Sequence, residues 1–570
     1  MVRTKVGSAL AVLALVFAAC TPGASPTPGS PGTSPGTSPT GGAPSPTSAV
    51  KEGGTLVVAL PGDMTAADPS FVSDSNSSYI HLNVVEGLLG TKPGSISEIE
   101  PVLAAEMPTV SDDLLTYTFK LREGIKFHDG EPFNAEAVVY NYERQLNAPE
   151  PLRDNYNYYF GAVFGGFAEK SNLASVTAID ATTVEFKLKQ PQSNFLISQA
   201  PLPQFGIQSP KALKAGDADN PDPAKSPYAQ GKGTGLVGTG PFKFKEWVPN
   251  DHVTIVKNED YWNAAAKAHL DEVIFKPYAD QTAEFNALQS GDIDMAQTIL
   301  PNDAQSLEGN AEFQVFDRGD SCNVAVLQMN HTHKPLDNKD VRFAIAHALN
   351  KQAYIDAFYA GQAVPADNWM PPATQYYKAL NLPTYDEAKA KEYITKSGLS
   401  GADLTIEFWY PADVSRPYMP DPKALAEAIA TDLEKVGFTI NFKTAGWRTG
   451  YLRDEAVGKF PMWLLGWTCD WAGPDNFLST AFFHGDGGKP NKEFAYGPPE
   501  LLSAFDKGLA APTEADVKAA WEEAQDILAR DLPTVPLVHS RPPAAGKAFI
   551  KGFVGAGNLN EALNTVWLDK

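Results

Sequence analysis

The stretch LLTYTFKLREGIKFHDGEPFNAEAVVYNYER, residues 114–144, contains in order a strand pattern, a tight turn and a helix pattern. Its first nine residues alternate apolar and polar side chains, which is the two-residue period of a half-buried strand. Residues 128–130, His-Asp-Gly, predict a tight turn in which the glycine adopts a positive φ. Asn134 then stands at the N-cap position of a helix whose apolar residues share one face. One short stretch therefore predicts a mixed α/β protein.

Strand and helix patterns also alternate, without a fixed repeat, on both sides of this stretch. GGTLVVAL (53–60) and TTVEFKLKQP (182–191) read as strands that stop at prolines. VRFAIAHALNKQAYIDAF (341–358) reads as one amphipathic helix, and PKALAEAIATDLEKVGF (422–438) as another with Asp421 as its cap. Such irregular alternation is typical of α/β lobes.

Length and charge limit the classes of function. With 570 residues the chain is too long for one hydrophobic core, so we expect two or more lobes. Its formal net charge of -22 argues against nucleic acid as a partner, because phosphate binding requires clustered Lys and Arg. An acidic surface does not by itself identify a ligand.

The first twenty residues predict a targeting segment. Arg3 and Lys5 precede the apolar run ALAVLALVFAAC (9–20), which is too short to span a bilayer comfortably. The final Ala-Ala-Cys resembles the lipobox of bacterial lipoproteins, which implies cleavage before Cys20 and lipidation of its thiol. Phe17 departs from that box, where Leu, Val or Ile is usual. The alternative is a plain secretory signal that is cut nearby.

A tether follows the cysteine. Every residue from Thr21 to Ser48 is Thr, Pro, Gly, Ala or Ser, a composition that cannot form a core, and we take 21–50 as the tether. A tether after a lipidated cysteine lets a domain stand off from a membrane. We therefore expect a protein that is anchored to the membrane and does not span it.

The motifs of the common enzyme classes are missing from the sequence. There is no G-x-S-x-G, H-E-x-x-H, Walker A or C-x-x-C motif. His331 and His333 alternate like a pair of metal ligands, but no third ligand follows at a telling spacing, and we read them as polar strand-end residues. We therefore expect no enzyme activity, no cofactor and no metal site.

Several long blocks resemble one family, the large extracytoplasmic solute-binding proteins of ABC importers for peptides. The opening stretch is one of them, and the others are GTGPFKFKEW (238–247), ALQSGDIDMA (287–296), PLDNKDVRFAIAHALNKQAYI (335–355) and DLPTVPLVH (531–539). The resemblance covers the chain from about Gly53 onward. It implies the two-lobed α/β fold of the type II periplasmic binding proteins, in which hinge strands join the lobes and ligand is enclosed between them.

The resemblance also implies the domain boundaries. They are 1–20 for the signal peptide, 21–50 for the tether, 53–319 with 540–570 for lobe one, about 98–237 for its extra subdomain, and 320–539 for lobe two, with hinge strands near 316–324 and 535–543. Cys322 and Cys469 then fall in the same lobe, in a compartment where disulfides form. The sequence leaves open whether they pair or remain two buried free thiols.

The implied ligand site lies in two short segments. In GWTCDWAGPDNF (466–477), Asp470 matches the aspartate that receives the ammonium group of the ligand. In SRPYMP (415–420), Arg416 matches the arginine by which the dipeptide-binding branch takes the ligand carboxylate. A guanidinium binds a carboxylate with two parallel hydrogen bonds. Trp467 and Trp471 are expected to wall the cleft, whereas residues 475–476 are expected to begin a helix.

The resemblance implies a binding protein that delivers dipeptides or short peptides to a membrane permease. We expect a monomer, lipid-anchored to the outer face of the bacterial cytoplasmic membrane. Two alternatives stay open. One is a family member that binds another solute, such as an oligosaccharide, a metal chelate or haem, and the other is a surface receptor without a transport role.

Overall fold

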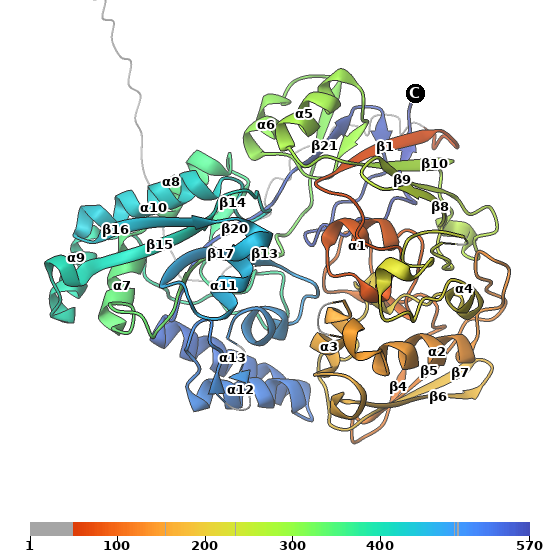
Figure 1. The fold of residues 1–570 in the computed structure, drawn as a ribbon, viewed down its shortest axis with the longest axis horizontal. Coiled ribbons are helices and arrows are strands. Elements are labelled where there is room, and N and C mark those ends of the chain that lie inside the picture. The colour runs from red at the N-terminus through yellow and green to blue at the C-terminus, as the bar shows by residue number, and fades with distance from the viewer. Residues whose placement is uncertain (1–48, 154–155, 234, 484, 487–488) are drawn as a thin grey trace, which may run out of the picture. The chain divides into compact units, whose positions relative to one another are not determined.

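Three β-sheets organise the part of the chain that the structure describes (Figure 1). The computed structural model describes residues 49–153, 156–233, 235–483, 485–486 and 489–570. Cys20, the apolar run before it and the tether up to Ser48 lie outside these residues. Residues 50–570 form one compact unit.

The first sheet has seven strands and is built from both ends of the described chain. In spatial order they are β12 (Phe313–Phe316), β21 (Ala544–Lys547), β11 (Met295–Ala296), β1 (Thr55–Leu60), β10 (Glu272–Pro277), β9 (His252–Lys257) and β8 (Phe242–Val248). β1 runs parallel to β10 and β11, and the other pairs are antiparallel. The predicted strand at 53–60 is thus confirmed as a central strand.

The second sheet has six strands from a single stretch of the sequence. They are β14 (Ala363–Pro365), β20 (Val535–Ser540), β13 (Asn323–Met329), β17 (Met462–Thr468), β15 (Thr405–Pro411) and β16 (Thr439–Ala445). β15 is parallel to both β16 and β17, whereas β13 is antiparallel to both β17 and β20. β15, β16, β17 and β20 therefore all run in one direction.

The third sheet contains the strand of the stretch 114–144. Its antiparallel strands are β4 (Thr109–Val110), β5 (Thr116–Lys120), β7 (Thr183–Leu188) and β6 (Leu173–Asp180). The turn at Gly130 has the predicted positive φ, 85°. Asn134 caps the helix α2 (Ala135–Leu146) by accepting a hydrogen bond from Ala137 N. The strand, turn and helix predictions are confirmed.

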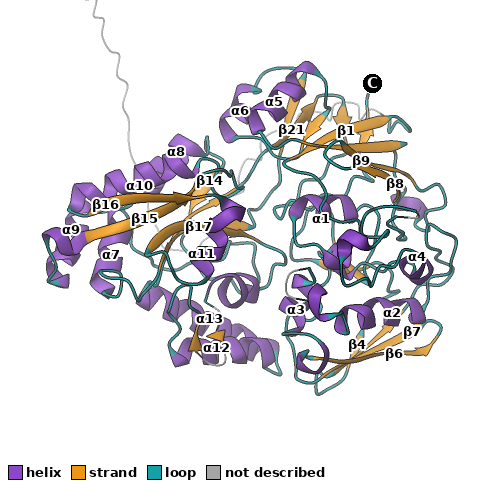
Figure 2. Ribbon diagram, in the orientation of Figure 1, coloured by secondary structure: helices purple, strands orange, loops and turns teal. Residues whose placement is uncertain are grey.

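Helices surround the sheets (Figure 2). They are α1 (Ser75–His81), α3 (Tyr158–Phe164), α4 (Pro210–Ala215), α5 (Gln281–Ser290), α6 (Pro301–Ser306), α7 (Lys339–Ala348), α8 (Lys351–Phe358), α9 (Glu387–Ser397), α10 (Pro422–Val436), α11 (Leu452–Ala456), α12 (Pro499–Ala510) and α13 (Glu514–Asp531). Asp421 caps α10 as predicted. The single helix predicted over 341–358 is wrong, because α7 ends at Ala348 and the side chain of Asn350 caps a new helix, α8, by accepting from Ala353 N.

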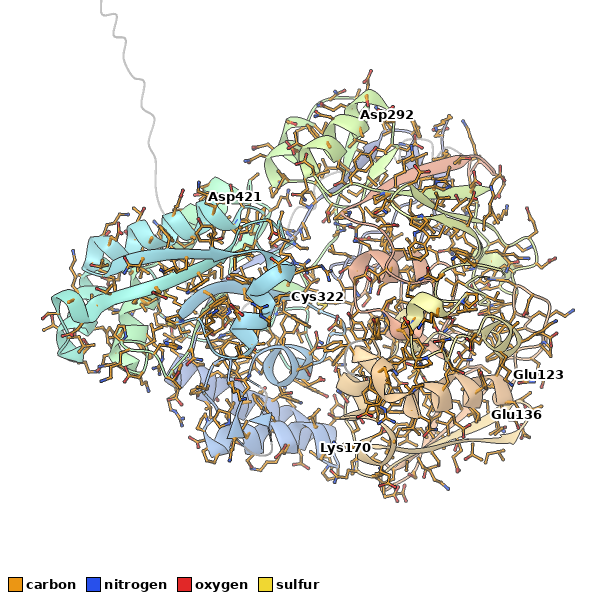
Figure 3. The ribbon with its side chains drawn as sticks, viewed as in Figure 1. Glu123, Glu136, Lys170, Asp292, Cys322 and Asp421 are labelled. Carbon is orange, nitrogen blue, oxygen red and sulfur yellow. A yellow bond between two sulfur atoms is a disulfide. The ribbon has the colours of Figure 1, made fainter. Side chains whose placement is uncertain are left out.

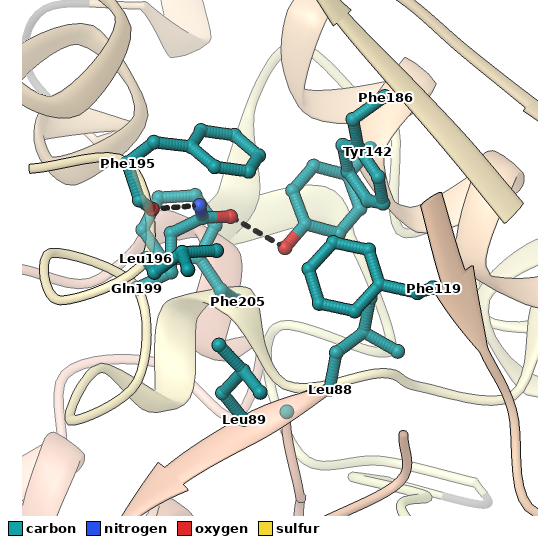
Figure 4. A pocket seen from close by; sticks show the side chains of 10 residues that line it. Leu88, Leu89, Phe119, Tyr142, Phe186, Phe195, Leu196, Gln199 and Phe205 are labelled. Carbon is teal, nitrogen blue, oxygen red and sulfur yellow. Dashed lines mark hydrogen bonds between the residues drawn. The ribbon is translucent and has the colours of Figure 1, made fainter. Parts of the chain in front are cut away.

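A hollow lies in the aromatic core beside the third sheet (Figure 4). It is lined by Gly87, Leu88, Leu89, Phe119, Tyr142, Phe186, Phe195, Leu196, Gln199 and Phe205. Tyr142 Oη donates to Gln199 Oε1 at 2.7 Å, and Gln199 Nε2 donates to the carbonyl oxygen of Phe195. Its lining includes neither Asp470 nor Arg416.

The chain passes twice between the seven-stranded and six-stranded sheets, once between β12 and β13 and once between β20 and β21. Arg318, whose side chain is 2% exposed, holds these crossings together. It donates to Glu561 Oε1 at 2.6 Å and to Pro542 O at 2.9 Å. It also donates to Gln297 O at 2.6 Å. One buried guanidinium thus ties together four separate segments.

Within the described residues, none of the helices is both long enough and apolar enough to cross a membrane. The structure joins Cys322 to Cys469 by a disulfide, with their Cα atoms 5.5 Å apart (Figure 3). Of the two alternatives that the sequence leaves open, the structure contains the bonded pair.

Replacing Arg318 by methionine should destabilise the protein strongly. The substitution keeps an apolar stem but leaves the buried carboxylate of Glu561 without its partner, which costs about 3–5 kcal/mol for such pairs. The free energy of unfolding, measured by urea denaturation, should fall by that amount. Arg530→Met is the matched control, because Arg530 is 52% exposed in its ion pair and should lose far less. Equal losses in the two variants would contradict a role for Arg318 in holding the crossings.

Candidate ligand-binding site

The chain segments that follow three neighbouring parallel strands meet at one edge of the six-stranded sheet (Figure 1). The segment after β16 carries Trp447, the segment after β15 carries Arg416, and the segment after β17 carries Asp470. In α/β proteins ligands bind outside the carboxyl ends of parallel strands. The topology therefore places both predicted charged residues at the edge where a ligand is expected.

Asp470 is held by an amide and a phenol. Asn476 Nδ2 donates to Asp470 Oδ2 at 3.1 Å, and Asp470 N donates back to Asn476 Oδ1 at 3.0 Å. Tyr159 Oη, from α3, donates to Asp470 Oδ1 at 2.9 Å. Trp467 Nε1 donates to the same Asn476 oxygen at 3.1 Å, which fixes the orientation of the amide. The carboxylate is thus oriented by residues from two distant parts of the sequence.

The charge of Asp470 is only partly compensated. Burial raises its pKa to about 6, and the hydrogen bonds from Asn476 and Tyr159 counter only part of this rise. Among the described residues, no Lys, Arg or His forms an ion pair with it. A carboxylate in this state gains from a cationic ligand, because the ligand supplies the missing positive charge.

Arg416 lies on a tight turn after β15. Arg416 N donates to Met419 O at 3.0 Å, and Met419 N donates to Arg416 O at 2.8 Å. Its guanidinium carbon lies 5.4 Å from the centre of the Trp447 ring and 6.0 Å from that of Tyr418. Rings at such distances attract a cation and restrict its orientation.

One donor of Arg416, its Nε, lacks a partner among the described residues. This Nε is buried, and no carboxylate of the described chain forms an ion pair with Arg416. Buried polar groups are rarely left unpaired, so such a donor indicates a missing partner. A carboxylate matches the fork of the guanidinium.

The platform under Arg416 is rooted in the sheet. The Trp447 ring stacks on Tyr451, with centroids 5.7 Å apart and planes 21° apart. Tyr451 Oη donates to the carbonyl oxygen of Leu464 at 2.7 Å, and Leu464 belongs to β17, which pairs with β15. Trp447 N donates to Asp413 Oδ1 at 2.7 Å. Trp447 begins a π-helical turn, Trp447–Tyr451, and no pattern in the sequence predicted its contact with Arg416.

Trp467 and Trp471 differ in their surroundings. Trp467 is partly exposed, and its contact with a ligand stays a prediction. Trp471 is 1% exposed and packs among residues of the third sheet and its helices. Its Nε1 donates to Asp475 Oδ2 at 2.9 Å, and Asn194 Nδ2 donates to the same oxygen at 2.6 Å. In this structure Trp471 therefore offers no open face to a ligand, and a ligand contact through it stays a prediction.

Asn476 and Tyr159 both contact Asp470, but sequence patterns indicate neither contact. The helix expected to begin at 475–476 does begin there, as the π-helical turn Asn476–Phe482. The side chain of Asn476, however, turns to Asp470, which the helix pattern did not indicate. Tyr159 stands 311 positions before Asp470, and no local signal connects the two residues.

The two histidines considered as metal ligands are both bonded to the backbone. His331 Nε2 lies 2.9 Å from Pro533 O, and His333 Nε2 lies 3.1 Å from Gly458 O. In the described ranges, no three His, Cys, Asp or Glu side chains gather in an arrangement that could hold a metal ion.

A known family model matches more than half of the chain. The model of the bacterial extracellular solute-binding proteins, family 5 Middle, matches residues 98–489. This range includes both Arg416 and Asp470.

The relatives are named for different ligands. Di/tripeptide-binding protein 1 of Pseudomonas aeruginosa is 31% identical over 450 residues, covering 76% of this chain and 80% of that protein. Heme-binding protein A of Haemophilus influenzae is 29% identical over 494 residues, covering 84% of this chain and 85% of that protein.

Among solved structures, the ABC transporter-associated periplasmic binding protein DppA of Helicobacter pylori, in complex with the peptide STSA, superposes with a TM-score of 0.74. It is 27% identical, and the match covers 91% of this chain and 99% of that one. The predicted fold class, a periplasmic-binding-protein-like α/β fold, is confirmed.

The raised pKa of Asp470 predicts a pH-dependent stability of the ligand-free protein. Its usual pKa is about 3.9 and its folded pKa about 6. Between these values the folded state holds a proton that the unfolded chain has lost, so stability falls as pH rises through this window. Relative to Asp470→Asn, wild type should lose on the order of 1–3 kcal/mol from pH 4 to pH 7.

Urea denaturation of both proteins across this range measures the difference directly. Asp475, whose pKa burial also raises to about 6, is common to both proteins and cancels. A difference between wild type and Asp470→Asn that stays constant with pH would contradict the burial of an ionising Asp470.

Proposed function

The chain belongs to family 5 of the bacterial extracellular solute-binding proteins, and on that premise we propose that it captures dipeptides or short peptides for an ABC importer. The observation that carries this proposal is the pairing of opposite charges at one sheet edge. Asp470 and Arg416 follow the adjacent parallel strands β17 and β15, and neither has an ion-pair partner in the described chain. A zwitterionic peptide supplies both missing partners.

The two charges act together as a length gauge. The ammonium and carboxylate of a peptide are separated by a distance that its backbone sets. A carboxylate and a guanidinium that are both fixed to one sheet therefore favour ligands of matching length. Polar groups in a desolvated site also reject ligands that leave one of them unpaired, typically at a cost of about 2–5 kcal/mol. Side chains of the ligand can be accommodated more loosely, through bridging water.

A second reading within the family is a different solute. The haem-binding relative has a comparable identity to this chain, so family membership alone does not select a ligand. Neither haem nor an oligosaccharide requires one ammonium-binding and one carboxylate-binding group at neighbouring strand ends. The Asp470–Arg416 arrangement therefore favours a peptide. A surface receptor without a transport role is distinguished by whether permease and ATPase genes lie beside this gene.

We propose that the two large sheets are the cores of two lobes, residues 53–319 with 540–570 and residues 320–539, with a subdomain at about 98–237. Arg416 and Asp470 both belong to lobe two, and Tyr159 and Asn194 approach from the subdomain of lobe one. Ser193 N also donates to Leu509 O at 2.8 Å. A ligand held by lobe two would add its own contacts with lobe one to these hydrogen bonds when the lobes close. The permease would then recognise the closed form.

We propose that Cys20 is the lipidated N-terminus of the mature protein and that the Pro/Gly/Ser/Thr tether holds the binding unit away from the membrane. The resemblance of Ala-Ala-Cys to a lipobox and the tether composition support this. The permease would then take ligand from an anchored, monomeric partner.

Removing the charge of Asp470 should weaken binding of a free dipeptide by on the order of tenfold to thousandfold, because a desolvated ion pair is lost. N-acetylation of the dipeptide removes the same ion pair from the ligand side. Acetylation should therefore reduce affinity far more in wild type than in Asp470→Asn. Isothermal titration calorimetry of free and acetylated dipeptide with both proteins measures this coupling.

Asp475→Asn is the matched control, because Asp475 is bonded to Asn194 and Trp471 and should keep the full penalty for acetylation. Arg416→Lys should lose most of its preference for a dipeptide acid over its C-terminal amide, because lysine cannot bind a carboxylate with a fork. If acetylation costs wild type and Asp470→Asn the same affinity, Asp470 does not hold the ammonium.

Replacing Cys20 by serine should release the protein into the medium or leave it unprocessed, because serine cannot form the thioether to the lipid. Membrane fractionation and the mass of the N-terminal peptide report on this. Thr21→Ala is the matched control and should remain membrane-bound. Unchanged fractionation and processing of Cys20→Ser would rule out lipidation at this residue.

A further inference from the structure

We propose that the chain crossing at residues 321–323 and 540 positions both charged groups of the site, Asp470 through the Cys322–Cys469 disulfide and Arg416 through Ser540. This inference rests on the proposed function, and it adds that affinity for a zwitterionic peptide depends on the oxidation state of that disulfide. Cys322, Cys469 and Ser540 are positioning residues and need not touch the ligand.

The disulfide lies one residue from the ammonium-binding group. β13 and β17 are paired up to Asn323 and Thr468, and the next residue on each side is a cysteine. Cys469 N donates to Cys322 O at 2.8 Å, and the two sulfur atoms are bonded. The side chains are buried, since Cys322 is 0% and Cys469 4% exposed. The covalent bond therefore fixes the chain immediately before Asp470, where the regular strand pairing has ended.

The other end of the disulfide is itself anchored. Ser321 Oγ donates to Ser540 O at 2.6 Å, and Asn323 Nδ2 donates to the same oxygen at 2.8 Å. Ser540 N donates to Asn323 Oδ1 at 3.1 Å. Cys322 thus sits between two residues that bond to the second crossing strand. The disulfide therefore links the residue before Asp470 covalently to this hydrogen-bonded crossing.

The same crossing reaches the carboxylate-binding group. Ser540 Oγ lies 2.7 Å from Pro417 O and 2.8 Å from Asn323 Oδ1, within hydrogen-bonding distance of both acceptors. Pro417 directly follows Arg416 in the sequence. Both charge-bearing segments are therefore attached to one short region, which is also where the chain passes between the two large sheets.

Preorganisation explains why these attachments matter for affinity. Without the disulfide, the backbone bond from Cys469 N to Cys322 O and the bonds of Asp470 to Asn476 and Tyr159 remain, but no covalent link ties this segment to the crossing. A freer segment lets the carboxylate move towards water, so binding an ammonium must then also order that segment. The loss falls on ligands with a free ammonium, since an acetylated ligand gains little from Asp470.

The test compares wild type with the double variant Cys322→Ala/Cys469→Ala, using alanyl-leucine, its N-acetyl form and its C-terminal amide as probes. Affinity for alanyl-leucine should fall by about tenfold, in the range of couplings between neighbouring groups. Affinity for the N-acetyl form should change by less than about threefold. A dithiol reagent can reduce the disulfide of wild type to two thiols by giving up two electrons and two protons. Wild type reduced in this way should show the same selective loss of affinity.

Ser540→Ala tests the second attachment without touching the cysteines. It should weaken alanyl-leucine and its N-acetyl form alike, but not the C-terminal amide, because it acts through Arg416. A purely structural role would lower the affinity for all three probes by one factor. If the double variant does not fold, reduced wild type tests the role of the disulfide, and Ser540→Ala tests the second attachment.

The outcomes also separate this inference from the proposed function. If wild type does not prefer alanyl-leucine to its N-acetyl form, the proposed function fails. If wild type has that preference and the folded double variant keeps it unchanged, the disulfide does not position Asp470. An equal loss for acid and amide in Ser540→Ala likewise overturns the role of Ser540.

Discussion

The parallel pairing of β15 with both β16 and β17 is the constraint on which the rest of the site depends. It directs three chain segments, with Trp447, Arg416 and Asp470, to one edge of the six-stranded sheet. Because β13 is antiparallel to β17 and β20, the carboxyl end of β20 and the amino end of β13 lie at this edge as well. The candidate site and the passage of the chain between the two large sheets therefore share one place in the fold.

The burial of Asp470 connects stability to function. Burial raises the pKa of this carboxyl group to about 6, so in the absence of ligand its charge is unfavourable at neutral pH. Neutral donors, Asn476 and Tyr159, orient it without supplying a charge. The same arrangement that lowers the stability of the free protein leaves a carboxylate without a cationic partner in the described chain, and we propose that a ligand ammonium fills that place. The guanidinium carbon of Arg416 lies over the Trp447 ring, 5.4 Å from its centre, and the buried Nε lacks a partner in the described chain.

Local patterns predicted local structure well. The capping residues Asn134 and Asp421 act as expected, because a cap depends only on the next three residues. The break at Asn350 was missed, because apolar periodicity continues across it. Asp470 and Arg416 were found only through resemblance to a family, and their shared sheet edge follows from strand order, which spacing along the sequence does not contain. Tyr159 and the burial of Trp471 depend on contacts between segments more than 200 residues apart, for which a single sequence carries no signal.

A crystal structure of the protein with a bound dipeptide would show directly whether Asp470 and Arg416 hold the two ends of the ligand. We expect the ligand ammonium to lie about 3 Å from an oxygen of Asp470 and the ligand carboxylate to accept two hydrogen bonds from the Arg416 guanidinium. We also expect Arg416 to remain over the Trp447 ring in the complex. A dipeptide bound with its ends on other residues, or with Asp470 still bonded only to Asn476 and Tyr159, would contradict these expectations.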